Sequence, residues 1–239
     1  MRKLTLIFFV IIYSATLVFA GNKNEVTPQN ALQSYLNNGD KSFKWEVQDK
    51  MKVDGVTLYR LIFVSQTWRD LVWKHELTVM VPDELKYNDA LLFVTGGAVK
   101  NGEPNIHNWD KDEIKMFSQI AITNKAITAI VWQVPNQPIF DGKTEDEIIS
   151  YTFHNFQGDH DYTWPLLFPM AKSAIRAMDA IQEFAKKELK TKVNEFVVSG
   201  ASKRGWTTWL TGASDKRVKA IGPMVIDMLN MQVNIPYHK

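Results

Sequence analysis

The sequence predicts an α/β protein whose mostly parallel sheet begins with an antiparallel hairpin. Two observations carry this expectation. After residue 90, short apolar runs alternate with longer segments of helical period, which is the order of elements in a sheet covered by helices on both faces. Before that point, two strand patterns lie close together with one short connection, which indicates an antiparallel hairpin. The later connections are long enough for right-handed helical crossovers, which make neighbouring strands parallel.

The chain opens with the composition of a secretory signal peptide over residues 1–20. Arg2 and Lys3 precede an almost unbroken apolar run, and Val18 and Ala20 stand at the two positions that a signal peptidase reads. A membrane anchor is the alternative, but the run is short for a span, which needs about 20 residues. We therefore expect a secreted or periplasmic protein with no membrane attachment after cleavage.

The charge balance of the remaining chain excludes several classes of partner. The whole sequence has 28 Lys and Arg against 26 Asp and Glu, and the first 20 residues hold two of the basic ones, so 26 of each sign remain. No basic stripe predicts binding to nucleic acid. Because the chain has no cysteine, it has no disulfide, no thiol catalysis and no cysteine-ligated zinc. We expect neither a metal nor another cofactor.

A polar leader is expected between the signal peptide and the folded domain. Residues 21–44 are rich in Asn, Lys and Gln and hold at most one short helix, around Asn30 to Leu36. One domain then occupies residues 45–239.

The elements of this domain follow from hydrophobic periodicity. Alternating apolar residues predict a first strand over Val56–Phe63 and a second over Glu76–Val81, with Trp68 to Trp73 in the link. Thr144 and Glu147 stand in the spacing of a capping box, which marks the start of a helix. The later elements, in order, are strand Ala90–Val94, helix Asp110–Asn124, strand Ile127–Val134, helix Thr144–Tyr151, a long helix from Thr163, strand Val193–Ser199, helix Lys203–Thr211 and strand Val218–Ile226.

The segment around Ser202 carries the clearest chemical signal. A buried strand runs into Gly200, the serine follows, and a helix begins with Gly205 near its start. A nucleophile elbow needs this context, because its strained turn from strand to helix has room only for small neighbours. We therefore expect an α/β-hydrolase-like fold with Ser202 as the catalytic nucleophile. The second glycine comes one position later than in Gly-X-Ser-X-Gly, so a structural turn with an incidental serine is the alternative.

Groups that could stabilise an oxyanion flank this turn in the expected fold. The backbone N–H of Lys203 follows the serine, and Gly96 and Gly97 follow the third strand, where such hydrolases place their second donor. Arg204 is a candidate substrate-binding residue for an anionic group such as a carboxylated sugar or peptide. Alternatively, Lys203 and Arg204 simply begin a solvated helix, although two cations are unfavourable there unless something negative lies nearby.

A serine hydrolase of this fold also needs an acid and a histidine after the serine. Asp227 is the candidate acid, with a strand-end residue as the alternative reading, and His238 is the only later histidine. We therefore expect the sequence to be C-terminally incomplete, ending just after the sixth strand. His160 lies in a polar loop and is a candidate substrate-binding residue, or else a solvated surface residue.

Several motifs together resemble the PhoPQ-activated pathogenicity-related proteins. They are Ser65–Trp68 with Trp73–His75, Phe93–Gly97, Gln133–Pro138, Trp164–Met170 and Ser199–Leu210. The resemblance runs from about residue 45 to the end and implies an α/β-hydrolase fold. The family includes virulence-associated bacterial proteins and a secreted proliferation repressor of slime moulds, and its substrates are poorly defined. The elbow is also similar to Gly-X-Ser-Arg-X-Gly of glucuronoyl esterases, whose second glycine is likewise late.

These observations lead to one functional expectation and two alternatives. We expect a secreted serine hydrolase, an esterase or amidase acting on a small-molecule, carbohydrate or peptide substrate, whose chain here lacks the catalytic histidine. The first alternative is a non-catalytic signalling or virulence-associated protein that uses a hydrolase fold to bind a cell-surface receptor. The second is a fragment that does not fold stably, because a sheet without its last strands exposes an edge.

Overall fold

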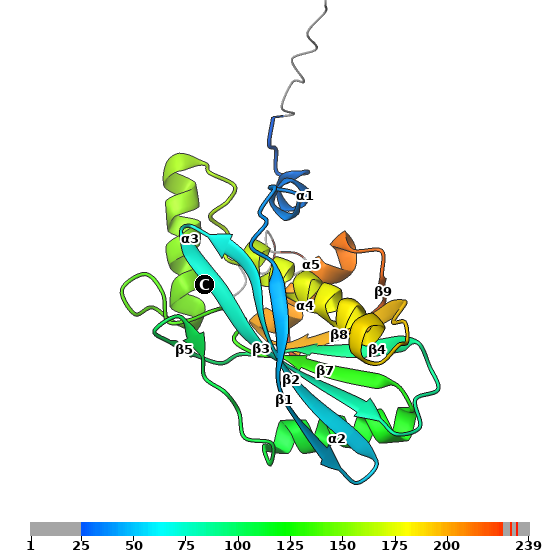
Figure 1. The fold of residues 1–239 in the computed structure, drawn as a ribbon. Helices are drawn as coiled ribbons and strands as arrows, with labels where there is room; N and C mark the ends of the chain where they lie inside the picture. The colour runs from blue at the N-terminus through cyan, green and yellow to red at the C-terminus, as the bar shows by residue number, and fades with distance from the viewer. Residues whose placement is uncertain (1–24, 227–229, 231–232, 234–239) are drawn as a thin grey trace, which may run out of the picture.

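The computed structural model describes residues 25–226, Asn230 and Val233. The expected signal peptide and the candidate acid Asp227 lie outside the described residues. A sheet of seven strands forms the centre, in the order β1-β2-β3-β7-β4-β8-β9 (Figure 1). The strands are β1 (Lys44–Val53), β2 (Val56–Trp68), β3 (Leu71–Pro82), β4 (Asp89–Val94), β7 (Ile127–Val131), β8 (Glu195–Ala201) and β9 (Val218–Met224). A separate two-stranded sheet pairs β5 (Val99–Lys100) with β6 (Glu103–Pro104).

The strand directions confirm the expected mixed sheet. β4 pairs parallel with β7 and β8, and β8 pairs parallel with β9. The pairs β1–β2, β2–β3 and β3–β7 are antiparallel, so five of the seven strands run the same way. The third strand of the expected series therefore lies between the fourth and the fifth, and the loops after all three leave the same edge.

Helices cover both faces of this sheet (Figure 1). The helices are α1 (Ala31–Leu36), α2 (Asp112–Asn124), α3 (Glu145–Asp159), α4 (Leu167–Glu188) and α5 (Lys203–Ser214). One hydrophobic core lies between the sheet and α4, with Leu77, Leu92 and Phe184 fully buried. A smaller core lies under α2 and contains Ile114 and Trp132. Among the described helices, none combines the length and apolarity needed to cross a membrane.

The hairpin is longer and tighter than the sequence pattern indicated. β2 and β3 pair over twelve positions, and only Arg69 and Asp70 connect them. Both residues have positive φ, 48° and 62°, which matches the twist that a two-residue hairpin turn requires. The expected link from Trp68 to Trp73 is therefore mostly strand. Similarly, α3 continues to Asp159, well beyond the expected short helix, although its capping box is confirmed.

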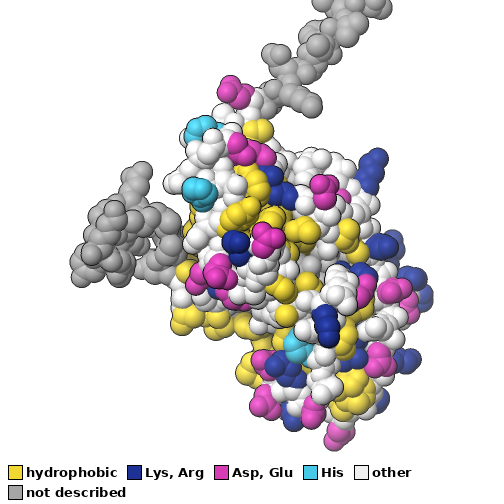
Figure 2. All heavy atoms as spheres, turned by 90° about the vertical axis from the view of Figure 1, so that its left-hand side faces the viewer, with side chains coloured by type: hydrophobic (Ala, Val, Ile, Leu, Met, Phe, Trp, Pro, Cys, Tyr) yellow, Lys and Arg dark blue, Asp and Glu magenta, His cyan; other side chains and the backbone are white. Residues whose placement is uncertain are grey.

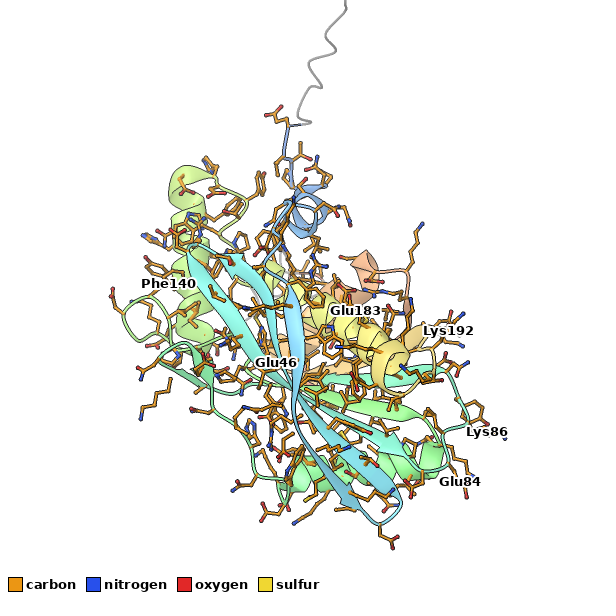
Figure 3. All side chains as sticks on the ribbon, viewed as in Figure 1. Glu46, Glu84, Lys86, Phe140, Glu183 and Lys192 are labelled. Atoms are coloured by element: carbon orange, nitrogen blue, oxygen red, sulfur yellow. The ribbon has the colours of Figure 1, made fainter. Side chains whose placement is uncertain are left out.

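Strand β1 was not expected from the sequence, and a β-bulge explains why. The pairing with β2 shifts between Val47 and Asp49, so the side chains before and after the shift point to opposite faces. Trp45 consequently packs on the α4 side, while Met51 packs on the α2 side. Figure 3 shows Glu183 of α4 beside β1, where its carboxylate accepts a 2.6 Å hydrogen bond from Trp45 Nε1.

The segment before β1 packs onto the domain through α1. Tyr35 is buried, its ring lies 6.0 Å from that of Phe168, and its hydroxyl donates a 2.7 Å hydrogen bond to Gln66 Oε1. The helix expected around residues 30–36 is confirmed. Residues 31–36 of the expected polar leader thus belong to the folded domain.

A second bulge directs two consecutive polar residues of β2 toward α4. The pairing with β3 shifts between Val64 and Gln66, so Ser65 and Gln66 are both fully buried on the same side. Gln66 Nε2 donates to Pro169 O at 2.8 Å, and Ser65 Oγ lies 3.0 Å from His75 Nε2. The motif residues from the hairpin therefore form a hydrogen-bonded network inside the core.

The network fixes the protonation of His75. Its Nδ1 lies 2.9 Å from the carbonyl oxygen of Trp132, so Nδ1 carries the proton and Nε2 accepts from Ser65. Complete burial disfavours the charged ring and lowers the pKa of His75 to about 4, against weaker raising effects of the hydrogen bonds around Trp132 and Gln133. His75 is thus a neutral structural residue of the core.

The stability of the protein should therefore fall in mild acid. Below pH 6.5 the unfolded His75 binds a proton and the folded one does not, so the free energy of unfolding decreases by about 1.4 kcal/mol per pH unit down to about pH 4.5. Urea unfolding at about pH 7.0, 6.0, 5.5 and 5.0 measures this slope. The His75→Gln variant should lose this contribution, and an equal slope in both proteins would contradict the assignment.

Candidate active site

The turn between β8 and α5 has the geometry of a nucleophile elbow. Ser202 adopts φ 55° and ψ −127°, a conformation that costs a non-glycine residue about 1–3 kcal/mol. Its side chain is exposed, whereas the flanking Ala201 and Lys203 are half-buried and buried. The backbone N–H of Ser202 donates a 2.9 Å hydrogen bond to Met224 O at the end of β9. Ser202 therefore lies exposed at the edge of the sheet.

Two glycines make this turn sterically feasible. A Cβ on Gly200 would lie 2.7 Å from Arg204 O and 2.9 Å from Val94 O. A Cβ on Gly205 would lie 2.9 Å from Met224 O and 3.1 Å from the carbonyl oxygen of Gly200. Real Cβ atoms essentially never come within 3.0 Å of backbone atoms, so neither position accepts a side chain without a shift of the backbone. Gly205, one position later than the second glycine of the usual motif, therefore still allows the close contact between α5 and the sheet that the turn requires.

The loop after β4 lies beside this turn because Val94 pairs with Gly200. Gly97 has φ 146°, and a Cβ there would lie 3.0 Å from the backbone nitrogen of Gln133. Within residues 25–226, the backbone N–H groups of Gly96 and Gly97 donate no hydrogen bond. Lys203 is the first residue of α5, so its own N–H has no acceptor inside the helix. The structure thus brings all the expected oxyanion donors to one edge of the sheet.

A buried ion cluster anchors the continuation of the β4 loop to the sheet. The Glu76 carboxylate is fully buried and accepts hydrogen bonds from Arg60 Nε at 3.0 Å and from His107 Nδ1 at 2.8 Å. The His107 ring stacks on Trp132, with centroids 3.9 Å apart. The loop is attached at His107, which donates from its backbone N–H to Glu76 Oε2 at 3.0 Å and accepts from Arg60 at its carbonyl oxygen at 2.6 Å.

The cations that follow Ser202 have a partner, which is Glu145 at the start of α3. Lys203 Nζ lies 2.5 Å from Glu145 Oε2 and 3.0 Å from Asp146 Oδ1. The Arg204 guanidinium donates two hydrogen bonds to the same Glu145 carboxylate, at 2.8 and 2.7 Å, and a third to Val134 O at 2.6 Å. The negative group that two cations at a helix start require is therefore present.

The Glu145 carboxylate is strongly held in its ionised form. Its partial burial alone would raise the pKa, but hydrogen bonds from Arg204, Lys203 and Gln137 outweigh burial and lower the pKa to about 2. Its backbone N–H also donates to Gln137 Oε1 at 2.8 Å. Glu145 itself has a positive φ of 51°, so strain at the helix start accompanies these contacts.

His160 does not join this group. It ends α3 at the C-terminal side, and a helix of this length separates its two ends by roughly 20 Å. Its exposed side chain lines a cavity of about 520 Å³ next to α1. Within the described part of the chain, no group of three acidic or histidine residues could hold a metal ion.

Sequence reasoning missed Glu145 and Gln137 as parts of the site. The pair of cations after the serine indicated that a negative group was needed, but the sequence did not identify which acid supplies it.

The loops after β4 and β7 leave on the left of Figure 1, the side that faces the viewer in Figure 2. Figure 2 shows hydrophobic side chains at the surface there, with acidic and basic side chains among them.

Comparison with solved structures gives the fold. Acetyl xylan esterase 1 from a Thermoanaerobacterium species matches with a TM-score of 0.56 and 13% identity, over 90% of this chain and 68% of that chain. An acetyl xylan esterase from a Paenibacillus species matches with a TM-score of 0.52 and 13% identity, over 88% of this chain and 63% of that chain. At this identity the likeness shows the α/β-hydrolase fold alone.

Comparison of sequences gives the family. Autocrine proliferation repressor protein A of Dictyostelium discoideum is 34% identical over 215 residues, which are 85% of this chain and 42% of that protein. This chain thus spans less than half the length of that curated relative. The pattern that describes the PhoPQ-activated pathogenicity-related proteins matches residues 32–238. The chain therefore belongs to the family of PhoPQ-activated pathogenicity-related proteins.

Proposed function

We propose that this protein is an exported serine hydrolase that cleaves a carboxylic ester or amide with Ser202 as the nucleophile. One observation carries the proposal: an exposed serine in a strained turn from strand to helix, beside a glycine loop whose N–H groups donate no hydrogen bond within residues 25–226. The strained backbone at Ser202 costs about 1–3 kcal/mol, and an exposed residue offers no packing that would offset this cost. A catalytic role explains why the strain is kept.

In the proposed reaction, Ser202 Oγ attacks the carbonyl carbon of the substrate and a tetrahedral oxyanion forms. The Lys203 N–H and the Gly96 and Gly97 N–H groups donate to this oxygen, and the N-terminus of α5 adds its positive dipole. Each lost donor of this kind raises the barrier by about 2.7–4 kcal/mol. A histidine must take the serine proton, and Asp227, which follows β9 in the sequence, is kept as the proposed acid that orients it.

The substrate class rests on the fold and the charge of the site. Two structural neighbours are named as acetyl xylan esterases, so small acyl esters of carbohydrates are the first class to test. Arg204, predicted from the sequence to bind an anionic group, already pairs with Glu145. We therefore keep an ester or amide of a small molecule, carbohydrate or peptide as the substrate and assign Arg204 no direct contact with it.

A second function is favoured by the family relative named as an autocrine proliferation repressor. A hydrolase fold can serve as an extracellular signal that binds a cell-surface receptor without catalysis. Adding the purified protein and its Ser202→Ala variant to growing cells separates the two proposals. Equal repression of growth by both proteins would support signalling that needs no nucleophile.

Replacement of Ser202 by alanine should abolish ester hydrolysis. In a full-length relative that supplies the histidine, we expect kcat/KM for p-nitrophenyl acetate to fall by at least about a thousandfold, because the variant lacks the oxygen that forms the acyl intermediate. The matched control is Ser199→Ala, since the Ser199 hydroxyl is occupied by a 2.6 Å hydrogen bond to Gly222 O. Equal rates for wild type and the alanine variant, measured in a full-length relative with the serine that matches Ser202, would refute the catalytic proposal.

The Gly205→Ala variant should lose both activity and stability. Its new Cβ would lie 2.5 Å from Ile226 Cγ2 and 2.9 Å from Met224 O, so α5 must move and the elbow with it. We expect a loss of about 1–3 kcal/mol in the free energy of unfolding. Gly212→Ala is the control, because its Cβ would clash only with Ile221, away from the turn. Equal losses of hydrolysis in both variants would show that the turn has no special role.

A further inference from the structure

The proposed oxyanion site has two arms, the backbone N–H of Lys203 and the loop of Gly96 and Gly97. Both arms depend on the ion cluster around Glu145. Lys203 supplies one N–H donor from its backbone, and its side chain is bound by Glu145. The Arg204 guanidinium lies against the second arm, because a Cβ on Gly96 would be 2.6 Å from its terminal nitrogen. Glu145 is thus the common partner of a residue within one arm and a residue that packs against the other.

Glu145 is itself held by a well-packed loop. Gln137 contacts it twice, through the side chain at 2.5 Å and through the Glu145 backbone N–H at 2.8 Å. Phe140, labelled in Figure 3 on the loop that leads into α3, packs on Trp68 and Tyr151 with ring centroids 5.6 and 5.0 Å apart. The carboxylate therefore sits on a supported segment, as a group that positions others must.

The cluster also decides the charge that a substrate meets. The side chains of Lys203 and Arg204 are only 8% and 12% exposed, whereas those of Glu145 and Asp146 are 40% and 86% exposed. Solvent therefore reaches the carboxylates and hardly reaches the cations. The carboxylate of an anionic substrate would lose its hydration at this site, and no unpaired cation would compensate for that loss.

We propose that Glu145 is the positioning and specificity-determining residue of this site. It fixes both oxyanion arms through Lys203 and Arg204, and together with Asp146 it cancels their two charges, so that the site takes neutral acyl groups and rejects carboxylates. The inference rests on the proposed hydrolase function. It identifies the substrate class of that same site as uncharged esters.

The kinetic test compares Glu145→Gln with wild type in a full-length relative that has the matching glutamate and supplies the histidine. The substrates are two esters of p-nitrophenol, the neutral acetate and the anionic hemisuccinate. For the acetate we expect kcat to fall roughly tenfold with little change in KM. This loss is smaller than that for removing one oxyanion donor, because the donors are displaced and not removed. For the hemisuccinate we expect KM to fall, because one cation is no longer neutralised. Unchanged preference between the two esters would overturn the inference.

A matched control carries the same change of charge on the same turn of α3. Glu147→Gln removes a carboxylate that caps the helix by accepting from the Thr144 N–H at 3.2 Å, and among the described residues Glu147 forms no ion pair with Lys203 or Arg204. It should alter stability without altering the preference between the esters. An equal shift of preference in both variants would show a general charge effect and would overturn the role of Glu145.

A binding measurement separates failure of this inference from failure of the proposed function. Calorimetric titration with inorganic phosphate should detect saturable binding to Glu145→Gln and none to wild type, whether or not either protein hydrolyses an ester. If no protein hydrolyses either ester and phosphate still binds only the variant, the hydrolase proposal fails and the charge-cancelling role stands. Equal phosphate binding by both proteins overturns it.

Should Glu145→Gln fail to fold, Glu145→Asp provides the second variant. It keeps the charge and shortens the reach to Lys203 and Arg204. We expect it to lower kcat for the acetate ester while phosphate remains unbound. Wild-type kcat in this variant would show that the positions of the two cations do not depend on the length of the Glu145 side chain, and would overturn the positioning role.

Discussion

The close approach of α5 to the edge of the sheet is the constraint on which the site depends. Where β8 ends, the backbone of Arg204 lies so near Gly200 that no side chain fits between them, and Gly205 is enclosed in the same way by Met224 O. The chain can turn from strand to helix in so little space only with Ser202 at φ 55°. The paired neighbours β4 and β9 hold the turn from both sides.

Electrostatics then joins this turn to two loops from elsewhere in the chain. Lys203 and Arg204 alone would oppose the dipole at the N-terminus of α5. The Glu145 carboxylate offsets that opposition, and the bidentate geometry with Arg204 adds orientation as well as attraction. Since Arg204 also donates to Val134 O and packs on Gly96, the elbow and the loops after β4 and β7 form one connected unit.

The polar residues buried elsewhere in the domain support this unit from a distance. On the α4 side, the bulge in β2 turns Ser65 and Gln66 into the core, where they connect α1, the hairpin and α4. On the α2 side, Glu76 binds Arg60 and His107, which fixes the loop that continues from Gly97. Both networks are satisfied by specific geometry, so they favour one arrangement of the strands over its alternatives.

The sequence by itself determined the order of the parallel strands and helices and the place of the elbow. Apolar runs such as Ala90–Val94 are unambiguous because a strand buried on both faces admits few polar residues, and the Gly-Ala-Ser turn is a local signal. It did not predict β1, because the bulge after Val47 moves Met51 to the opposite face of the sheet. The apolar residues of this strand therefore do not alternate regularly with polar ones. Only the tertiary structure decided that Glu145 pairs with Lys203 and Arg204. That contact joins residues 58 and 59 positions apart, and no local pattern encodes which acid a folded chain brings to a given cation.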